Sequence, residues 1–173
     1  MQVYLDNSAT TRPFDRVVDA MAAAMHDGYF NPSSMYRPAI DVENQMKQLR
    51  RDILRNLPGA AGDVYFTSGG TEGNNLALLG TAAMARGKRR FICSAVEHPS
   101  ILEPMRRIAE MGHDVKYIPV DGKGYIDLDA LRDMLDDSVE LVSCMHVNNE
   151  VGAIQPIAEI ARLIAERAPQ AKL

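Results

Sequence analysis

At 173 residues, the chain is long enough for one hydrophobic core of ordinary size and too short for two. Hydrophobic residues at 46%, charged residues at 24% and a net charge of −4 argue against a disordered chain and against nucleic acid as a partner. No apolar run approaches the roughly 18 residues that span a bilayer, and the start has no secretory signal, so we expect a cytoplasmic protein away from membranes.

Two helical patterns occupy the first third of the chain. Val18, Met21 and Met25 recur at helical spacing, and a longer pattern runs from Val42 to Leu57 and stops at Pro58-Gly59. The segment from Asn31 to Ser34 has no period and contains a proline, which predicts a loop. We expect residues 1–58 to form an N-terminal region of loop and helices.

From residue 59 onward, short β-rich runs alternate with helical patterns about every 25 residues. The predicted strands are Val64–Thr67, Phe91–Ser94, Val115–Ile118 and Leu141–Met145, with Asp127 as a helix N-cap, Pro156 opening the last helix, and a turn into a fifth strand at Pro169–Leu173. Repeated βαβ units predict an α/β fold with a mainly parallel sheet and flanking helices.

Neither the basic residues nor the cysteines indicate a site. Arg86, Lys88, Arg89 and Arg90 form a short cluster that is expected to be a solvated turn. Cys93 and Cys144 sit in apolar runs without the partner spacing of a zinc site, so buried reduced thiols are expected and no metal is.

The most informative stretch, Thr67–Asn75, follows a predicted strand and opens a helix. Small residues at a helix N-terminus offer free backbone N–H groups and a positive dipole end to an anion, which favours a phosphate site. The stretch is neither a Walker A loop nor a dinucleotide-binding glycine motif. A plain strand-to-helix turn explains it equally well when it is considered alone.

Two further polar clusters follow predicted strands and so belong to the same edge of the sheet. They are His98, within Val96–Ser100, and the pair Asn148 and Asn149, within His146–Gly152. Each has an ordinary explanation, a surface histidine or an asparagine turn. Three clusters at one edge are together a stronger indication of a binding site.

These motifs also resemble, in order and spacing, the signatures of cysteine desulfurases from about residue 4 to the end of the chain. They are Leu5–Thr11, Asn31–Ser34, Phe66–Asn75, Glu97-His98 and Val147–Gly152. The resemblance implies that residues 59–173 form the large domain of a class V aminotransferase-type enzyme, and that this domain is incomplete at its end. It implies pyridoxal 5'-phosphate as the cofactor and a homodimer.

The implied activity is removal of sulfur from L-cysteine, which gives L-alanine and an enzyme persulfide for a sulfur-acceptor protein in iron-sulfur cluster or thio-cofactor assembly. By the same resemblance, Gly70 and Thr71 bind the cofactor phosphate, and Asn149 lies beside cofactor and substrate. His98 stacks on the pyridine ring and moves protons, so it is the one catalytic residue expected here.

Two departures from the family pattern stand out. Phe30 and Tyr36 replace a glycine and a histidine that the family usually has around Asn31-Pro32. The lysine that binds the cofactor covalently is expected in a Ser-Gly-His-Lys context, which none of the five lysines has. Its aspartate, arginine and cysteine partners are also expected downstream of Leu173, so we expect a fragment that is inactive by itself.

Three alternatives keep part of this interpretation. A selenocysteine lyase or another enzyme of the same fold would change only the reaction. A non-catalytic binding module would keep only the phosphate site. A nicotinamide-dependent oxidoreductase is disfavoured because the glycine motif is missing.

Overall fold

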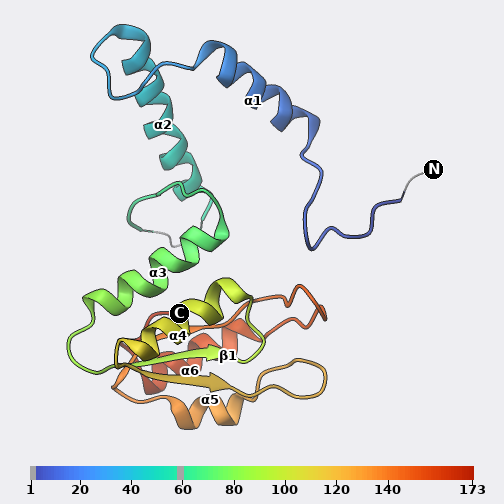
Figure 1. The fold of residues 1–173 in the computed structure, drawn as a ribbon, viewed down its shortest axis with the longest axis vertical. Helices are drawn as coiled ribbons and strands as arrows, with labels where there is room; N and C mark the ends of the chain where they lie inside the picture. Colours follow the sequence, from blue (N-terminus) through green and yellow to red (C-terminus); the bar gives the residue numbers. More distant parts are fainter. Residues whose placement is uncertain (1–2, 58–60) are drawn as a thin grey trace. The chain divides into compact units, whose positions relative to one another are not determined.

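The computed structural model describes residues 3–57 and 61–173. It divides into two compact units, Met1–Phe66 and Thr67–Leu173. The N-terminal unit contains α1 (Asp15–Asp27) and α2 (Arg37–Arg55), the two helices that the apolar spacing predicts (Figure 1). The predicted stop at Pro58-Gly59 lies outside the described residues, and the predicted division at residue 58 stays a prediction. No described helix is both long and apolar enough to cross a bilayer.

The second unit is a parallel sheet flanked by helices, which confirms the predicted α/β class. Its strands β1 (Arg90–Ser94), β2 (Asp114–Ile118) and β3 (Val139–Ser143) pair in the order β2-β1-β3. Its helices are α3 (Gly70–Met84), α4 (Pro99–Glu110), α5 (Leu128–Met134) and α6 (Ile157–Arg167). Both pairings are parallel, with Phe91 opposite Val115 and Leu141.

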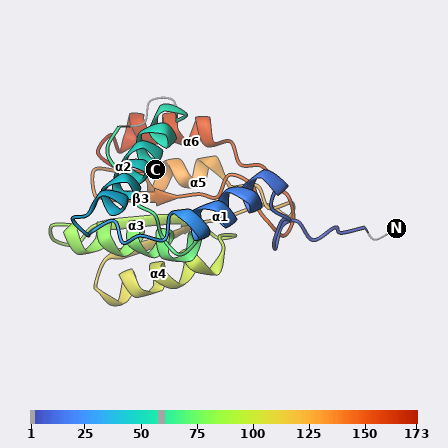
Figure 2. The same ribbon diagram turned by 90° about the horizontal axis from the view of Figure 1, so that it is seen from above.

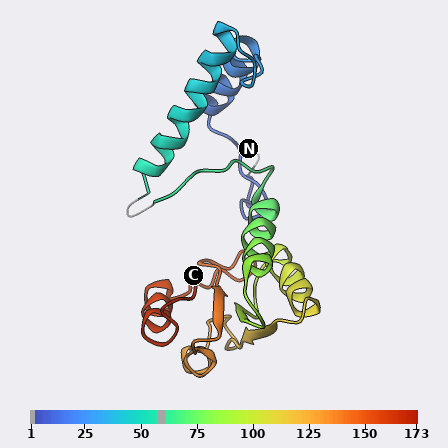
Figure 3. The same cartoon turned by 90° about the vertical axis from the view of Figure 1, so that its left-hand side faces the viewer.

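Alternating side chains of β1 supply both halves of the core. Phe91 and Cys93 pack with Met105 of α4 on one face of the sheet, while Ile92 packs with Ile160 of α6 on the other. Figures 2 and 3 show α3 and α4 on one side of the sheet and α5 and α6 on the other. Because both faces are covered at the centre of the sheet, β1 is buried from Phe91 to Ser94, whereas the edge strand β2 leaves Lys116 and Tyr117 exposed.

The prediction of a strand at Val64–Thr67 is wrong. These residues have no regular secondary structure and pair with no strand among the described residues, and Tyr65 and Phe66 are exposed. A β-rich segment becomes a strand only when a neighbour takes up its backbone hydrogen bonds. At the other end, Lys172 forms one parallel bridge to Leu141 of β3, in the segment where a fifth strand is predicted.

The predicted solvated turn of basic residues is wrong for two of its members. Arg90 donates to Asp114 at 2.8 Å, to Asp136 at 2.6 Å and to the carbonyl of Met134 at 2.9 Å, so it connects β1, β2 and the end of α5. Arg89 pairs with Glu140 of β3 at 3.1 Å. Charge neutralisation at the amino ends of the strands, rather than solvation, accounts for Arg89 and Arg90.

Replacing Arg90 with methionine keeps the aliphatic stem and removes the three interactions of the guanidinium. We expect the free energy of unfolding in urea at pH 7 to fall by roughly 1–3 kcal/mol, the range for hydrogen bonds to charged groups. Arg90 also holds the pKa of Asp114 below its ordinary value. Such a carboxylate stabilises the fold above its unfolded pKa and loses that effect as pH falls through the folded pKa, so the variant should lose less stability than the parent between pH 5 and 2.

The matched control is Arg106→Met, because Arg106 pairs with Glu103 on the exposed surface of α4. Exposed pairs of this kind contribute about 0–1 kcal/mol. Equal losses for the two variants, at pH 7 and across the acid range, would contradict the connecting role of Arg90.

Candidate functional site

The carboxyl ends of the three strands point to one edge of the sheet, where the loops after β1, β2 and β3 meet. β1 lies between β2 and β3, so the connection after β1 runs to one neighbouring position in the sheet and the connection after β2 crosses to the opposite side of β1. The strand order therefore reverses at β1. In open α/β sheets, ligands bind outside such a reversal of strand order. The residues predicted from the sequence, His98 after β1 and Asn149 after β3, lie in the two loops that flank this point.

Two buried side chains connect these loops. Glu97 is 7% exposed, and its Oε1 accepts hydrogen bonds from the Ser94 hydroxyl at 2.9 Å and the Met145 N–H at 2.6 Å. Asn148 is 6% exposed and donates to the carbonyl of Val96 at 2.9 Å. The backbone that carries His98 is therefore connected twice to the loop after β3.

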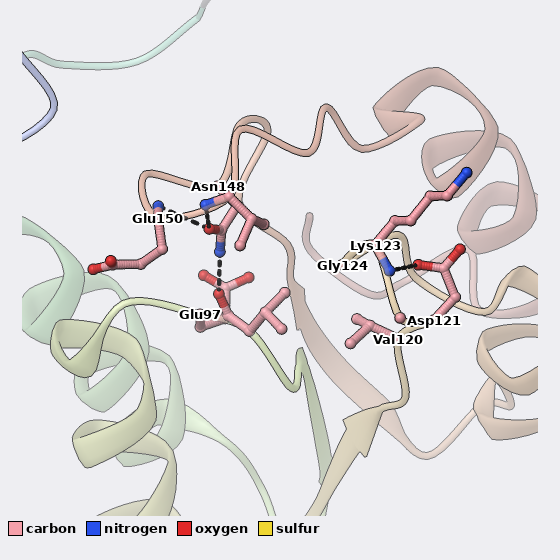
Figure 4. A pocket seen from close by; sticks show the side chains of 10 residues that line it. Glu97, Val120, Asp121, Lys123, Gly124, Asn148 and Glu150 are labelled. Atoms are coloured by element: carbon pink, nitrogen blue, oxygen red, sulfur yellow. Dashed lines mark hydrogen bonds between the residues drawn. The ribbon is translucent and has the colours of Figure 1, made fainter.

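A third buried polar side chain, Gln155, connects the loop after β2. Gln155 donates to the carbonyl of Gly124 at 2.7 Å and accepts from the N–H of Ile126 at 3.1 Å. Gly124 has a φ of +85°, and a Cβ there would lie 3.0 Å from Val151 Cγ2, so the two loops pack closely. Figure 4 shows the hollow of about 700 Å³ between them, with Glu97 and Asn148 on one side and Asp121 and Lys123 on the other.

The turn before α3 presents backbone amides as the sequence predicts. Gly69 is the N-cap, and Gly70 and Thr71 begin the helix, where N–H groups have no intrahelical acceptor. A Cβ added at Gly69 or Gly70 would meet nothing within 4 Å, so a ligand can approach this backbone. Glu72 accepts the Ser68 N–H at 2.6 Å, and its hydrogen bonds to Ser68 lower its pKa.

His98 begins α4 beside this turn. Asn74 of α3 donates to the Ser100 hydroxyl at 2.8 Å, and that hydroxyl lies 2.8 Å from His98 Nδ1. His98 and Thr71 line one hollow of about 440 Å³ between the starts of α3 and α4. Both helix N-termini therefore contribute to a single concave surface.

The structure separates the four predicted residues into a group and an outlier. Gly70, Thr71 and His98 come together at the adjoining starts of α3 and α4. Asn149 is exposed in the loop after β3, where its side chain donates to Glu150 at 3.2 Å, and it does not line the hollow with Thr71. Asn148, its neighbour, is the buried member of the pair.

The residues at this edge suit the cofactor that the resemblance implies. Free amides at Gly70 and Thr71, a threonine hydroxyl and an open approach are what a phosphate dianion requires. An exposed imidazole in the same hollow is suited to cover an aromatic ring. In the described part of the chain, no group of acidic, histidine and cysteine side chains could hold a metal ion.

Sequence reasoning missed the residues that hold the loops. Glu97, Asn148 and Gln155 are polar yet buried, and each satisfies its hydrogen bonds with backbone groups from a different loop. The only sequence signal was the place of Glu97 beside His98 and of Asn148 beside Asn149, and Gln155 had none. Burial of a polar side chain depends on which loops the fold brings together, and a single sequence does not show that.

Both cysteines are free, and neither has the features of a nucleophile. Cys93 is fully buried in β1, and Cys144, just after β3, is half-buried. Burial, with a smaller effect of the Glu97 charge, raises the pKa of each thiol to about 12. The expectation of buried thiols is confirmed for Cys93 and holds in part for Cys144.

Comparison with known proteins gives a consistent result. The family model described as aminotransferase class-V matches residues 3–171. The chain is 40% identical over 162 residues to "Cysteine desulfurase IscS 1" of Archaeoglobus fulgidus and 36% identical over 166 residues to "Cysteine desulfurase IscS" of Dictyoglomus turgidum. These alignments cover 92% and 95% of this chain and 42% of each relative.

Solved structures agree with the sequence relatives. A "NIFS-LIKE PROTEIN" matches with a TM-score of 0.93 at 35% identity, over 99% of this chain and 47% of that one. "SspA in complex with cysteine" matches with a TM-score of 0.84 at 31% identity, over 94% of this chain and 47% of that one. The chain thus spans less than half the length of these proteins, and the shared fold is well established.

The adjacent asparagines allow a matched test of structural and surface roles. Replacing Asn148 with alanine removes the hydrogen bond to Val96 and the two that its Oδ1 accepts from Glu150 and Val151 at 2.9 Å. We expect the free energy of unfolding to fall by roughly 1–3 kcal/mol. Asn149→Ala should change it by less than about 0.5 kcal/mol, as at other exposed positions. Urea denaturation of both variants measures this, and a larger loss for Asn149→Ala would reverse the assignment.

The cysteines should react slowly while the chain is folded. With pKa values of about 12, against about 8.5 for a free thiol, their thiolate populations near pH 8 fall roughly a thousandfold. Iodoacetamide labelling followed by peptide mass mapping, with and without urea, measures both rates. We expect Cys93 to be the slower site, and native rates equal to those in urea would show that burial does not protect the thiols.

Proposed function

The chain belongs to the aminotransferase class V family, and we propose that it is the cofactor-phosphate portion of a pyridoxal-phosphate-dependent cysteine desulfurase. The observation that carries the proposal is the joint placement of Thr71 and His98 in one hollow at the starts of α3 and α4. The similarity to proteins named cysteine desulfurase supports it. So does the fold of a protein whose structure is described as a complex with cysteine.

In this proposal, each group has a role that suits its chemistry. Gly70 and Thr71 bind the cofactor phosphate through backbone N–H groups and a hydroxyl. His98 covers the pyridine ring and helps to move protons, and Asn149 lies beside cofactor and substrate from the loop after β3. When bound, the cofactor supplies an electron-withdrawing ring that stabilises negative charge on the substrate.

Residues outside this chain complete the chemistry in this proposal. None of the five lysines stands in a Ser-Gly-His-Lys context, so we expect these 173 residues alone to form no specific lysine adduct and to turn over no L-cysteine. The curated relatives have more than half of their length outside the matched region, where we place the cofactor lysine and the sulfur-accepting cysteine. Homodimer formation and sulfur delivery to an acceptor protein are parts of the same proposal.

A chimera tests the proposal. This chain replaces the matched region of the Archaeoglobus relative, whose remaining sequence is kept unchanged. We expect the chimera to bind pyridoxal phosphate and to release L-alanine from L-cysteine, whereas the 173-residue chain alone releases none. A chimera that binds the cofactor and forms no alanine would contradict the function, and alanine from the chain alone would contradict the division of the site.

Two threonine variants of the chimera test the phosphate assignment. Thr71→Val removes the hydroxyl at nearly constant shape, so the Kd for pyridoxal phosphate should rise roughly three- to tenfold, which corresponds to one hydrogen bond. Thr81→Val makes the same change further along α3 and should leave the Kd unchanged. Equal Kd values for the two variants would remove Thr71 from the proposed phosphate site.

A further inference from the structure

His98 caps α4 with a ring nitrogen in place of the usual oxygen. Its backbone is extended, with φ −63° and ψ 148°, and its Nδ1 accepts the Ser100 N–H at 3.1 Å. Helix N-caps normally use the side-chain oxygen of serine, threonine, aspartate or asparagine for this bond. The imidazole therefore has a structural role at Nδ1 in addition to its proposed role in the hollow.

The capping bond fixes where the neutral ring carries its proton. A backbone N–H is only a donor, so the atom that receives it must present a lone pair. A neutral imidazole with a lone pair on Nδ1 carries its proton on Nε2. This conclusion depends on the main-chain donor of Ser100 and not on the orientation of any side-chain amide.

The hydroxyl of Ser100 reinforces the same state. Its oxygen lies 2.8 Å from the donor Nδ2 of Asn74 and 2.8 Å from His98 Nδ1. The oxygen accepts from Asn74, and because Nδ1 already presents its lone pair to the Ser100 N–H, the hydroxyl can only donate its single proton to Nδ1. Ser100 is 8% exposed, so little water reaches this hydroxyl to compete.

The same bonds connect the two helix starts. Asn74 lies one turn after Gly70 on α3, and Ser100 lies in the first turn of α4. A single 2.8 Å bond between their side chains therefore connects the helix that presents Gly70 and Thr71 to the helix that presents His98. Any shift of one helix start relative to the other would stretch this bond.

We propose that Ser100 and Asn74 are positioning residues that hold neutral His98 in the Nε2–H form, which leaves Nε2–H as a hydrogen-bond donor in the hollow. Nδ1 is already used by Ser100, while Nε2 makes no hydrogen bond within the described part of the chain. The catalytic consequence rests on the proposed function. The tautomer itself does not, because it follows from the capping geometry.

Nitrogen NMR of the cofactor-free 173-residue chain tests the tautomer directly. In the ¹⁵N-labelled chain above the titration range of histidine, we expect His98 Nδ1 to resonate as an unprotonated nitrogen and Nε2 as a protonated one. A scalar coupling across the hydrogen bond should connect Nδ1 to the Ser100 amide nitrogen. His113 is an internal reference, because its Nδ1 accepts the Arg89 N–H at 3.3 Å. A proton on Nδ1 of His98, or averaged shifts without the coupling, would overturn the proposal.

Two isosteric variants test the part played by Asn74. Asn74→Asp turns the donor into an acceptor, so the Ser100 hydroxyl should donate to the new carboxylate and release Nδ1. The Nδ1 resonance should then move toward that of an unbonded imine-type nitrogen while the coupling to the Ser100 amide remains. Asn75→Asp adds the same charge one residue along α3, where the native side chain bonds only the Thr71 carbonyl, and should leave Nδ1 unchanged.

The outcomes separate this proposal from the proposed function. Equal responses of Nδ1 to the two aspartates, or no response to either, would remove Asn74 from a positioning role. The capping coupling can be present in a chain whose chimera forms no alanine, in which case the function fails and the tautomer stands. If the chimera is active but His98 carries its proton on Nδ1, the function stands and the tautomer proposal fails.

Discussion

Parallel pairing of β1 with both β2 and β3 is the constraint on which the rest of the second unit depends. Because β1 is central, its side chains serve both halves of the core, and its carboxyl end lies between the ends of its two neighbours. The amino end is held by charge, through Arg90 and its acidic partners, and the middle by apolar packing. The carboxyl end is left for loops, which is where α/β proteins place their sites.

Those loops are held by buried polar side chains rather than by apolar packing. Glu97, Asn148 and Gln155 each bond to backbone groups of a neighbouring loop, so that the three loops form one connected edge. A buried polar group with its hydrogen bonds made costs little, but the loss of one partner leaves the other unsatisfied. We therefore expect substitutions at these three positions to lower the stability of the fold, and substitutions at exposed neighbours such as Asn149 to change its stability little.

The starts of α3 and α4 bring structure and proposed chemistry to the same atoms. A helix N-terminus needs an acceptor for its free N–H groups, and an anionic ligand is one such acceptor. At α3 these groups remain free at Gly70 and Thr71, which suits a phosphate. At α4 the side chain of His98 takes the place of the ligand, and this use of Nδ1 restricts its proton to Nε2. Asn74 and Ser100 join the two ends, so the amides of the proposed phosphate site and the imidazole belong to one hydrogen-bonded assembly.

The sequence by itself determined the helices, the alternation of strand and helix, and the glycine-containing turn that opens α3, because apolar spacing and small residues at a helix start act locally. It also determined the family, since motifs such as Thr67–Asn75 and Val147–Gly152 match the family's signatures in order and spacing. Only the tertiary structure decided that Val64–Thr67 forms no strand, that Arg89 and Arg90 lie in ion pairs, and that Asn148 is the buried asparagine. Each of these depends on a partner distant in sequence, whose hydrogen bond or charge is placed by the packing of other elements.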